Sequence, residues 1–365
     1  MDFTKPEAAQ DLSGLVGTIV DAVCTPQHQR ELDGLDQRLD TMLWSKLIDA
    51  DILSTAAPES IGGGGFGVLE QTAILTALGR QIAAVPYLES VVLGAGALAR
   101  FGSPELQQAW AAPAVAGQKV LTVALDGEWG QGPVQATASD DGFRLTGTRT
   151  QVPFGPVADA FLVLAETHSG TAVFLVSAGD PGVSVTALET TGQNSSGELE
   201  LADVEVGSDR MVGDGEVVAW LASTRAVGLT AFQLGVLERA LELTADYART
   251  REQFDRPIGS FQAVSQRLAD GYIDIKGLRL TCEQASWRLS EDLPADVEVA
   301  TAAFWAAEAG HRVAHTTVHV HGGVGIDTDH PVHRYFITAK QTEFALGGAT
   351  AALRVIGRDL ADAPA

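Results

Sequence analysis

The spacing of apolar residues divides the chain into segments with different secondary structure. Residues 1–117 carry apolar positions at helical spacing in short stretches, which predicts a helical N-terminal domain. At about Lys119 the period changes from 3.6 to 2, and strand-like runs follow one another without intervening helices. This pattern predicts a small antiparallel β-barrel or sandwich over 118–208. The expected strands are Val120–Leu125, Val134–Ala138, Phe143–Thr148, Ala160–Ala165, Ala172–Ser177, Val183–Leu188 and Glu198–Val204.

From about Glu216 the helical period returns in long stretches, which predicts a C-terminal four-helix bundle over 209–365. The expected helices are Val217–Thr250, Phe261–Ser290, Val297–Val320 and Val332–Leu360. The pattern as a whole predicts a mainly α-helical protein with a β-rich middle module.

Composition adds a strong acidic bias to this picture. The 365 residues include 24 Lys and Arg against 47 Asp and Glu, which gives a net charge of −23. Nucleic acid and anionic membrane surfaces would be repelled, so neither is expected as a partner. Cys24 and Cys282 are too few for a disulfide framework, and the sequence shows no signal-peptide pattern and no apolar run of about 18 residues. We expect an acidic cytoplasmic protein without membrane insertion.

Two conspicuous clusters are weak candidates for a site. The glycines at 62–65 lack the Gly-Lys-Ser/Thr ending of a phosphate loop, and no strand precedes them, so a turn that enters a helix is favoured. His311, His315 and His319 share one helix face, but no Glu or Cys completes a metal site. We therefore expect no metal, and we interpret these histidines as packing residues or as hydrogen-bond partners of a ligand.

A segment between the first two long helices is a stronger candidate. It places Arg249, Arg251 and Arg256 at a helix end, followed by Phe261 and Gln262 at the start of the next helix. A guanidinium offers a planar fork that suits phosphate. Arginines at a helix C-terminus also complement the helix dipole. Spacing alone leaves both interpretations open.

A second candidate is the run from His319 to Gly325, which contains Gly322, Gly323 and Gly325. One glycine is enough to end a helix, so three in four positions indicate the close approach of a ligand or a partner.

With these motifs in this order, the chain resembles the acyl-CoA dehydrogenases over essentially its whole length. That family carries Arg-x-x-Phe followed by Phe-Gln, here Arg251 to Gln262, and Gln-x-x-Gly-Gly-x-Gly, here His319 to Gly325. Its Pro-Glu-x-x-Gly-Gly loop is matched from Pro58. The resemblance implies the acyl-CoA dehydrogenase fold: an N-terminal helical domain, a small antiparallel β-barrel and a C-terminal four-helix bundle. It also implies FAD as the cofactor, α,β-desaturation of an acyl-CoA thioester, and an electron-transfer flavoprotein as acceptor.

The resemblance further implies which residues bind FAD on its pyrophosphate and adenosine side. They are Arg251, Phe254, Ile258, Phe261, Gln262, His319, His321, Gly322 and Gly323. The chain is more similar still to the smaller, beta-type chains of actinobacterial heteromeric enzymes that oxidise steroid side-chain thioesters. This similarity implies a CoA ester of a steroid or cholesterol side chain as substrate.

The departures from the family are informative. The reaction needs a carboxylate base over the substrate's α-carbon. The two positions at which the family places that carboxylate correspond here to Gly347 and Arg225, so no catalytic base is expected in this chain. The family's flavin-ring motifs are replaced by Leu125–Gly130 and by Gln151–Gly155.

This selective loss implies that the chain lends half of an FAD site to a catalytic alpha-type chain in an α2β2 heterotetramer. Two alternatives stay open. In the first, the chain is a self-sufficient enzyme with a displaced base. Glu343, one helical turn before Gly347, is the best candidate for that base. In the second, the chain is a flavin-free scaffold of the same fold.

Overall fold

The computed structural model describes residues 3–127, 130–192 and 194–362. Two compact units are present in this described part, each assembled from separate stretches of the chain. One comprises Met1–Arg30, Val68–Ala83 and Ala226–Ala365, and the other comprises Glu31–Gly67 and Ala84–Arg225. The helices of residues 1–117 are therefore divided between the units. The division of the sequence at 117 and 208 stays a prediction.

The second unit is built on a mixed sheet. Among the described residues the sheet has eight strands in the order β6-β7-β3-β2-β4-β5-β8, with β1 paired to β4. The strands are β1 Leu121–Ala124, β2 Val134–Ser139, β3 Gly142–Pro153, β4 Ala160–Thr167, β5 Gly170–Ser177, β6 Val183–Ala187, β7 Ser196–Gly207 and β8 Met211–Gly213. All seven expected strands are present, and the short β8 lies beyond the expected end of the module at 208.

The expectation of a purely antiparallel module was wrong. Both β1 and β2 run parallel to β4, with Leu121 opposite Ala160 and Val134 opposite Ala165. The turn signals specify hairpins only where the strands are joined tightly, as at Asp141-Gly142 between β2 and β3. The longer link 125–133 between β1 and β2 lets the chain return in the same direction, which alternation along each strand does not reveal.

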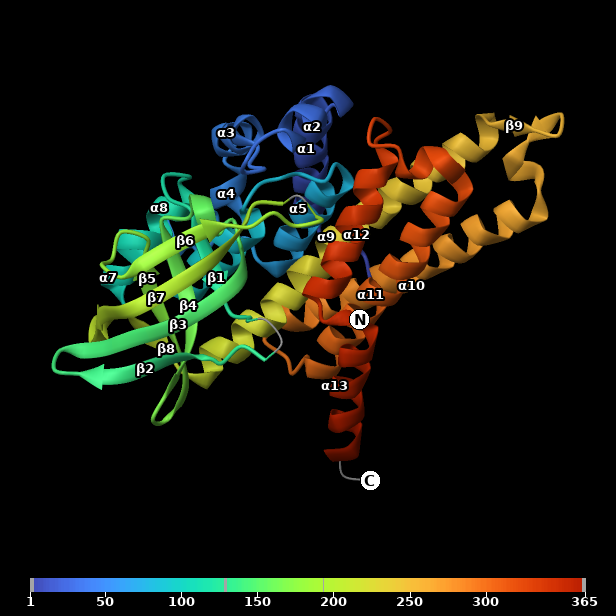
Figure 1. Cartoon of the computed structure of the whole chain (residues 1–365). Helices are drawn as coiled ribbons and strands as arrows, with labels where there is room; N and C mark the ends of the chain where they lie inside the picture. The colour runs from blue at the N-terminus through green and yellow to red at the C-terminus, as the bar shows by residue number, and fades with distance from the viewer. Residues whose placement is uncertain (1–2, 128–129, 193, 363–365) are drawn as a thin grey trace. The chain divides into compact units, whose positions relative to one another are not determined.

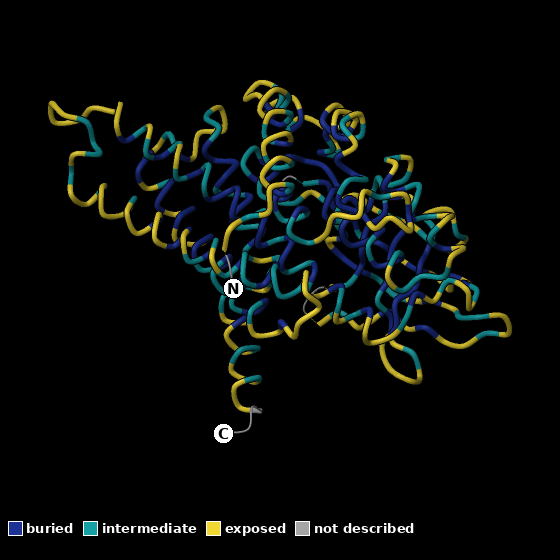
Figure 2. The backbone as a smooth tube through the Cα atoms, turned by 180° about the vertical axis from the view of Figure 1, so that it is seen from behind, coloured by how far each residue is buried: buried dark blue, intermediate teal, exposed yellow. Residues whose placement is uncertain are grey.

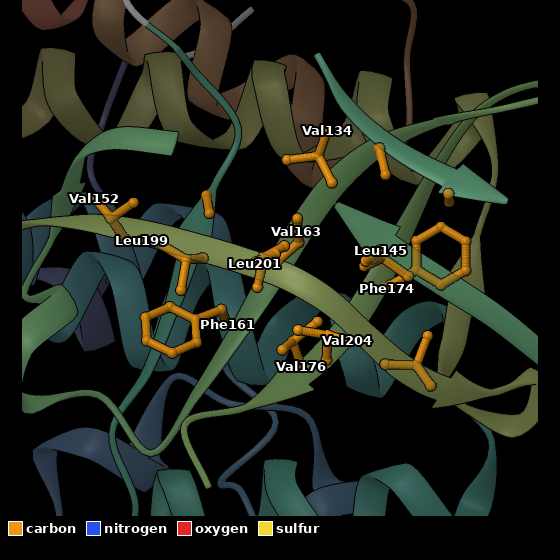
Figure 3. Close-up of a cluster of buried hydrophobic side chains, with 14 of the residues drawn as sticks. Val134, Leu145, Val152, Phe161, Val163, Phe174, Val176, Leu199, Leu201 and Val204 are labelled. Atoms are coloured by element: carbon orange, nitrogen blue, oxygen red, sulfur yellow. The ribbon is translucent and has the colours of Figure 1, made fainter. Parts of the chain in front are cut away.

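The sheet encloses an apolar core, seen as orange sticks in Figure 3. Phe161, Phe174, Leu145 and Leu199 are completely inaccessible to solvent. The ring of Phe143 packs edge-on against Phe174 with centroids 4.9 Å apart. Alternate residues of the strands supply this core, which is why the period-2 pattern located the strands.

Short helices complete this unit. They are α3 Thr41–Asp49, α4 Ile52–Thr55, η1 Glu59–Ile61, η2 Tyr87–Ala95, α6 Gly96–Phe101, α7 Pro104–Leu106, η3 Gln107–Ala111, α8 Ala112–Val115, η4 Gly155–Val157 and η5 Ser208–Arg210. The π-helix η2 packs against the start of β1, where the Leu121 N–H donates to Ser90 Oγ at 3.0 Å. The ring of Trp220 packs edge-on against Phe101, next to η2. The first contact joins η2 to β1, and the second joins α6 to the helix that carries Trp220.

The first unit is a helical bundle. Its elements are α1 Glu7–Val23, α2 Pro26–Asp33 (which continues into the other unit), α5 Val68–Arg80, α9 Gly215–Thr250 (which begins there), β9 Glu252–Gln253, β10 Arg256–Pro257, η6 Ile258–Ser260, α10 Gln262–Ser290, α11 Asp296–His321, η7 Gly322–Ile326, α12 Val332–Ala345 and α13 Gly348–Asp362. In Figure 1, α10 packs along α11, and α11 packs along α12 and α13. The buried Gln233 amide of α9 donates to Ala339 O at 3.0 Å, and also to Ala306 O, so one side chain joins α9 to α11 and α12.

The fourth expected helix is interrupted, contrary to the sequence-based prediction. Gly347 and Gly348 have φ values of 79° and 77°, in the left-handed region, so α12 ends before them and α13 begins at the second. The apolar period continues on both sides of the break because both helices pack on α11. The apolar spacing alone therefore predicted one continuous helix where the structure has two.

Within the described residues, α9 is the helix that is long and apolar enough to cross a membrane by length and composition. Half of its most apolar window is buried inside the protein, and core helices pass the same test.

Candidate functional site

The segment after α9 forms a solvent-exposed hairpin. The strands β9 and β10 pair with Arg256 opposite Gln253, and the two turn residues, Phe254 and Asp255, have φ values of 55° and 61°. Positive φ at both positions is costly for residues other than glycine. The Phe254 side chain is nevertheless 85% exposed. A strained, exposed aromatic that this unit does not bury points to a role outside the unit.

The three arginines of this segment have different environments. Arg249 forms an ion pair with Asp246 on its own helix. The Arg256 guanidinium lies 4.0 Å from the centroid of the Phe261 ring. Arg251 is fixed by its backbone, since its N–H donates to Tyr247 O at 2.8 Å and its carbonyl accepts from Ile258 N at 2.8 Å.

The Arg251 guanidinium is exposed and makes no hydrogen bond or ion pair with any residue that the structure describes. It is the arginine of this group that is available to an anion. The helix-dipole interpretation therefore applies to Arg249, whereas the geometry of Arg251 suits a phosphate group.

Phe254, Phe261 and Gln262 lie next to one another at this end of the bundle. The Phe254 and Phe261 rings meet edge-on with centroids 6.0 Å apart. Gln262 is the first residue of α10, and it is exposed. Ile258 is half-buried and holds the hairpin base through its bond to Arg251 O. Figure 2, which views the molecule from behind, shows this tip as exposed chain.

The structure explains two of the three glycines after α11 and leaves the third, Gly323, without a reason inside the described chain. Gly322 has φ 62° and ψ −138°, a conformation that a side chain disfavours. A Cβ at Gly325 would lie 2.9 Å from the Val318 backbone, so packing within the chain requires that glycine. A Cβ at Gly323 would meet nothing within 4 Å, and the residue has an ordinary φ. No contact within the described chain accounts for Gly323, which leaves room for a ligand or partner.

The two histidines of this run are not equivalent. His321 is 4% exposed, and its Nδ1 donates to Thr317 O at 2.8 Å because a carbonyl can only accept. Burial is the main cause of its lowered pKa, so the ring is neutral near pH 7. The His319 ring is exposed and makes no hydrogen bond to any described residue. The His321 ring is therefore buried in this chain, whereas the His319 ring is open to a ligand; a contact of either histidine with FAD stays a prediction.

His321 connects the two candidate segments. Its ring stacks on Tyr247 with centroids 4.3 Å apart, and His330 follows at 5.3 Å. Tyr247 lies one helical turn before Arg251. The hairpin segment and the Gly322-Gly323 segment are consequently neighbours in the bundle; we call residues 251–262 and 319–325 the lending segments.

The other clusters are explained by packing. Each amide of Gly62–Gly65 donates to a backbone carbonyl, namely those of Glu59, Pro58, Ser54 and Ala57 in turn, so none is available to a phosphate. His315 packs its ring on Phe336, and His311 lies 3.0 Å from Lys340 Nζ. In the described residues no group of three His, Cys, Asp or Glu side chains is placed to hold a metal ion.

Neither expected base position holds an acid, and Arg225 is engaged elsewhere. Its Nη2 lies 3.0 Å from Asp126 Oδ2. Asp126 belongs to the segment Leu125–Gly130 that stands in place of a flavin-ring motif; Glu128 and Trp129 lie outside the described residues. Two separate departures from the family pattern therefore contact each other as an ion pair.

The alternative base, Glu343, is also engaged. Its side chain is 14% exposed, its Oε2 lies 2.5 Å from Lys340 Nζ, and its Oε1 lies 3.4 Å from His311 Nδ1. Gly347 stands beyond the end of α12. The Glu343 carboxylate is therefore already held in contacts within the bundle.

Sequence reasoning missed Glu89. It lies on η2, and burial raises the pKa of its carboxyl to about 7, a shift that the backbone and the Arg225 guanidinium moderate. A carboxyl with that pKa is matched to proton transfer near neutral pH. The available signal was a lone acidic residue inside the apolar run 85–95, which on sequence alone indicates only a helix with one polar position.

Comparison with known proteins decides the family. Residues 6–118 match the N-terminal domain of acyl-CoA dehydrogenases, and residues 214–361 match their C-terminal domain. The chain belongs to the acyl-CoA dehydrogenase family. It is 72% identical to acyl-CoA dehydrogenase FadE27 of Mycobacterium tuberculosis, with all of both chains covered.

Solved acyl-CoA dehydrogenase structures have the same fold. A chain of the ChsE4-ChsE5 complex from Mycobacterium tuberculosis is 74% identical over the whole of both chains, with a TM-score of 0.99. A variant of the Tcur3481-Tcur3483 steroid ACAD is 37% identical over 98% of this chain and 99% of that one, with a TM-score of 0.92. The expected acyl-CoA dehydrogenase fold is thereby confirmed.

Proposed function

We propose that this acyl-CoA dehydrogenase chain is the beta-type, non-catalytic subunit of a heteromer, which lends half of an FAD site to a catalytic alpha-type partner. The observation that carries the proposal is the ion pair between Arg225 and Asp126. Arg225 stands at one of the family's base positions, and an arginine cannot accept a substrate proton at any physiological pH. Gly347 leaves the other base position without a side chain.

The lending segments fit the FAD that is general to the family. Arg251 presents an exposed guanidinium without a partner among the described side chains, which suits a pyrophosphate. Gly323 has no reason within the described chain to lack a Cβ, which suits the close approach of the adenosine side, and His319 is available to donate a hydrogen bond. When bound, FAD supplies the hydride acceptor of the reaction. This chain's own residues bind and orient it, and the partner contributes the base.

The similarity to chains of the ChsE4-ChsE5 complex and of a steroid ACAD supports a two-chain assembly and a steroid substrate. We propose an α2β2 heterotetramer that desaturates the CoA ester of a cholesterol side chain, as the beta subunit of a 3-oxocholest-4-en-26-oyl-CoA dehydrogenase would. An electron-transfer flavoprotein is the proposed acceptor, and the cytoplasm is the proposed compartment.

Visible flavin absorbance tests the proposal. The chain purified alone is expected to be colourless and inactive, whereas the chain co-expressed with an alpha-type partner is expected to carry one FAD per αβ pair and to reduce a dye with acyl-CoA. Flavin and ordinary turnover in the chain alone would show a self-sufficient enzyme.

Glu89 gives the self-sufficient enzyme a better base than Glu343, because it lies near the Arg225 position and titrates near neutral pH. Glu89→Gln in the active complex distinguishes a base on the partner from a base on this chain. The partner-base proposal expects turnover to persist, and a self-sufficient enzyme would lose about 10²–10⁴-fold.

A further inference from the structure

Three ring side chains, Tyr247, His321 and His330, lie in a row beside the lending segments; we call them the ring row. The His321 ring stacks on Tyr247 of α9 with an interplanar angle of 25°, and the His330 ring from the loop 327–331 lies 5.3 Å from His321. The Tyr247 carbonyl accepts the Arg251 N–H at 2.8 Å, and His321 directly precedes Gly322. A displacement of the ring row therefore reaches both lending segments through the backbone.

His330 acts as a hydrogen-bond acceptor at the start of α12. The Val332 N–H donates to its Nδ1 at 3.3 Å, so Nδ1 carries no proton in this arrangement. His333 bonds back to the loop, since its Nδ1 donates to the His330 carbonyl at 2.6 Å. The neutral His330 ring thus caps one of the N–H groups that the first turn of a helix leaves without a partner.

A proton on the His330 ring is unfavourable in this position. If it is bound at Nδ1, it removes the acceptor of the Val332 N–H. It also places a positive charge at the N-terminal end of α12, where the helix dipole favours negative charge. Burial is the main cause of the lowered pKa of His330; Asp327 acts against this shift and His333 adds to it. The folded arrangement therefore favours the neutral ring.

The titratable groups around the ring row give a proton little compensation. On the α11 side His321 is itself neutral near pH 7, because burial is the main cause of its lowered pKa and His330 is a further cause. Tyr247 on α9 contacts the row as a ring stacked on His321. Asp327 is the carboxylate that favours a proton on His330, and its Oδ1 already accepts the Asp329 N–H at 3.0 Å.

The loop that carries His330 is exposed. Ile326 is 73% exposed, and residues 327–329 are exposed as well. The Asp327 N–H donates to Val324 O at 3.2 Å, and the His330 N–H donates to Asp327 O at 3.1 Å. These two bonds stay within the segment 324–330, whereas the His330 ring reaches His321 of α11 and its Nδ1 reaches α12. Loss of the ring contacts is therefore expected to free the loop.

We infer that His330 is a positioning residue for the half of the FAD site that this chain lends: its neutral ring holds the ring row and the first turn of α12 in place, and its protonation frees the loop and loosens both lending segments. The inference rests on the proposed function and adds a regulation of that site by pH. Once the loop is free, His330 regains its ordinary pKa of 6.5. Flavin retention is therefore full above that pH and is lost as pH falls through the lower pKa of the bound ring.

The first test replaces His330 by a neutral cap. His330→Asn keeps an acceptor for the Val332 N–H, because asparagine is a favoured cap residue, but it does not titrate. The rate of FAD release from the flavin-loaded complex with the alpha-type partner is followed by flavin fluorescence. His330→Asn should match the wild type at about pH 8 and release FAD several-fold more slowly at about pH 5.5.

The second test adds a permanent charge. His330→Lys places a cation at the start of α12 at every pH of the assay, so its complex should release FAD at about pH 8 as fast as the wild type does at about pH 5.5. The matched control is His168→Asn, at an exposed histidine between β4 and β5, which should leave the pH profile of release unchanged. Thermal unfolding of the isolated variants shows whether each one folds. If His330→Lys does not fold, the comparison of His330→Asn with the wild type decides.

The outcomes separate this inference from the proposed function. Wild-type chain that neither binds an alpha-type partner nor carries flavin with it would refute the proposed function. A flavin-loaded complex with the same pH profile in wild type and His330→Asn would overturn the role of His330 alone. Fast release from His330→Asn at both pH values would make the ring a packing element and would overturn it too. So would a pH dependence that survives His330→Asn but disappears in His321→Phe, because His321 would then be the titrating group.

Discussion

The lending segments and the base positions of this chain differ in how their charged side chains are satisfied. At the lending segments Arg251 is held by its backbone while its guanidinium contacts no described side chain, and Gly323 has no internal reason to be glycine. At one base position Arg225 is paired with Asp126, and the alternative base Glu343, four residues before Gly347, is paired with Lys340. The exposed Arg251 guanidinium can bind an external anion without breaking a contact within the described chain, whereas Arg225 and Glu343 already have charged partners there. The contrast indicates that one region is organised for an external ligand and that the other is self-contained.

The largest expected effect comes from Arg251→Ala in the complex. Loss of a charge-assisted hydrogen bond to the pyrophosphate should weaken FAD binding by about 1.5–3 kcal/mol, roughly 10- to 100-fold. Flavin content measured from absorbance after gel filtration checks it. Arg249→Ala is the control, since Arg249 already pairs with Asp246 on the surface. Equal flavin content in both variants would remove Arg251 from the site.

Two glycine substitutions sharpen the comparison because they separate folding from ligand contact. Gly325→Ala should lower the thermal stability of the chain, because its Cβ would lie 2.9 Å from the Val318 backbone. Gly323→Ala should leave the isolated chain as stable as the wild type, because its Cβ meets nothing within 4 Å. In the complex, however, Gly323→Ala should reduce flavin content or assembly. If it affects neither, close approach does not explain this glycine.

The two regions should also differ in how their stability depends on pH, through His321 at the lending segments and Glu89 near Arg225. Burial lowers the pKa of His321 below its ordinary 6.5, so its contribution to folding is present above that value and is lost as pH falls through the folded-state pKa. His321→Phe keeps a ring to stack on Tyr247 but removes the titration. Urea unfolding at about pH 5 and pH 8 should show a smaller loss of stability on acidification in this variant than in the wild type. An identical loss would place the sensitive group elsewhere.

The contribution of Glu89 to stability should depend on pH in the opposite direction to that of His321. Its folded-state pKa of about 7 lies above the ordinary 4.5, so its contribution is present below 4.5 and is lost as pH rises through 7. Glu89→Gln should therefore be more stabilising at about pH 8 than at about pH 5. A pH-independent effect of this substitution in urea unfolding would contradict the raised pKa.

The sequence predicted what periodicity encodes. The strands β1 to β7 and the helices α9 to α11 follow from apolar spacing, because each element buries one face or stripe. The parallel pairing of β1 and β2 with β4, and the break at Gly347, depend on how elements meet in space, which spacing along the chain does not specify.

The candidate site divides in the same way. The lending segments could be found as motifs, since they consist of contiguous residues. The difference between His319 and His321 could not, because it depends on the stack with Tyr247 on another helix. Glu89 and Asp126 lie far from Arg225 in sequence, so the cluster around the base position required the fold.

The smallest expected effect is that of Glu343→Gln on turnover by the complex. Glu343 is held by Lys340 and His311 between α11 and α12, so its loss removes a local ion pair and affects stability rather than a reacting atom. Removal of a general base instead typically costs about 10²–10⁴-fold in rate. We expect kcat within about twofold of the wild type and a slightly lower melting temperature. A steady-state assay of the purified complex distinguishes a twofold change in kcat from a loss of several orders of magnitude. A collapse of kcat with normal flavin content would make Glu343 the base and this chain a self-contained enzyme.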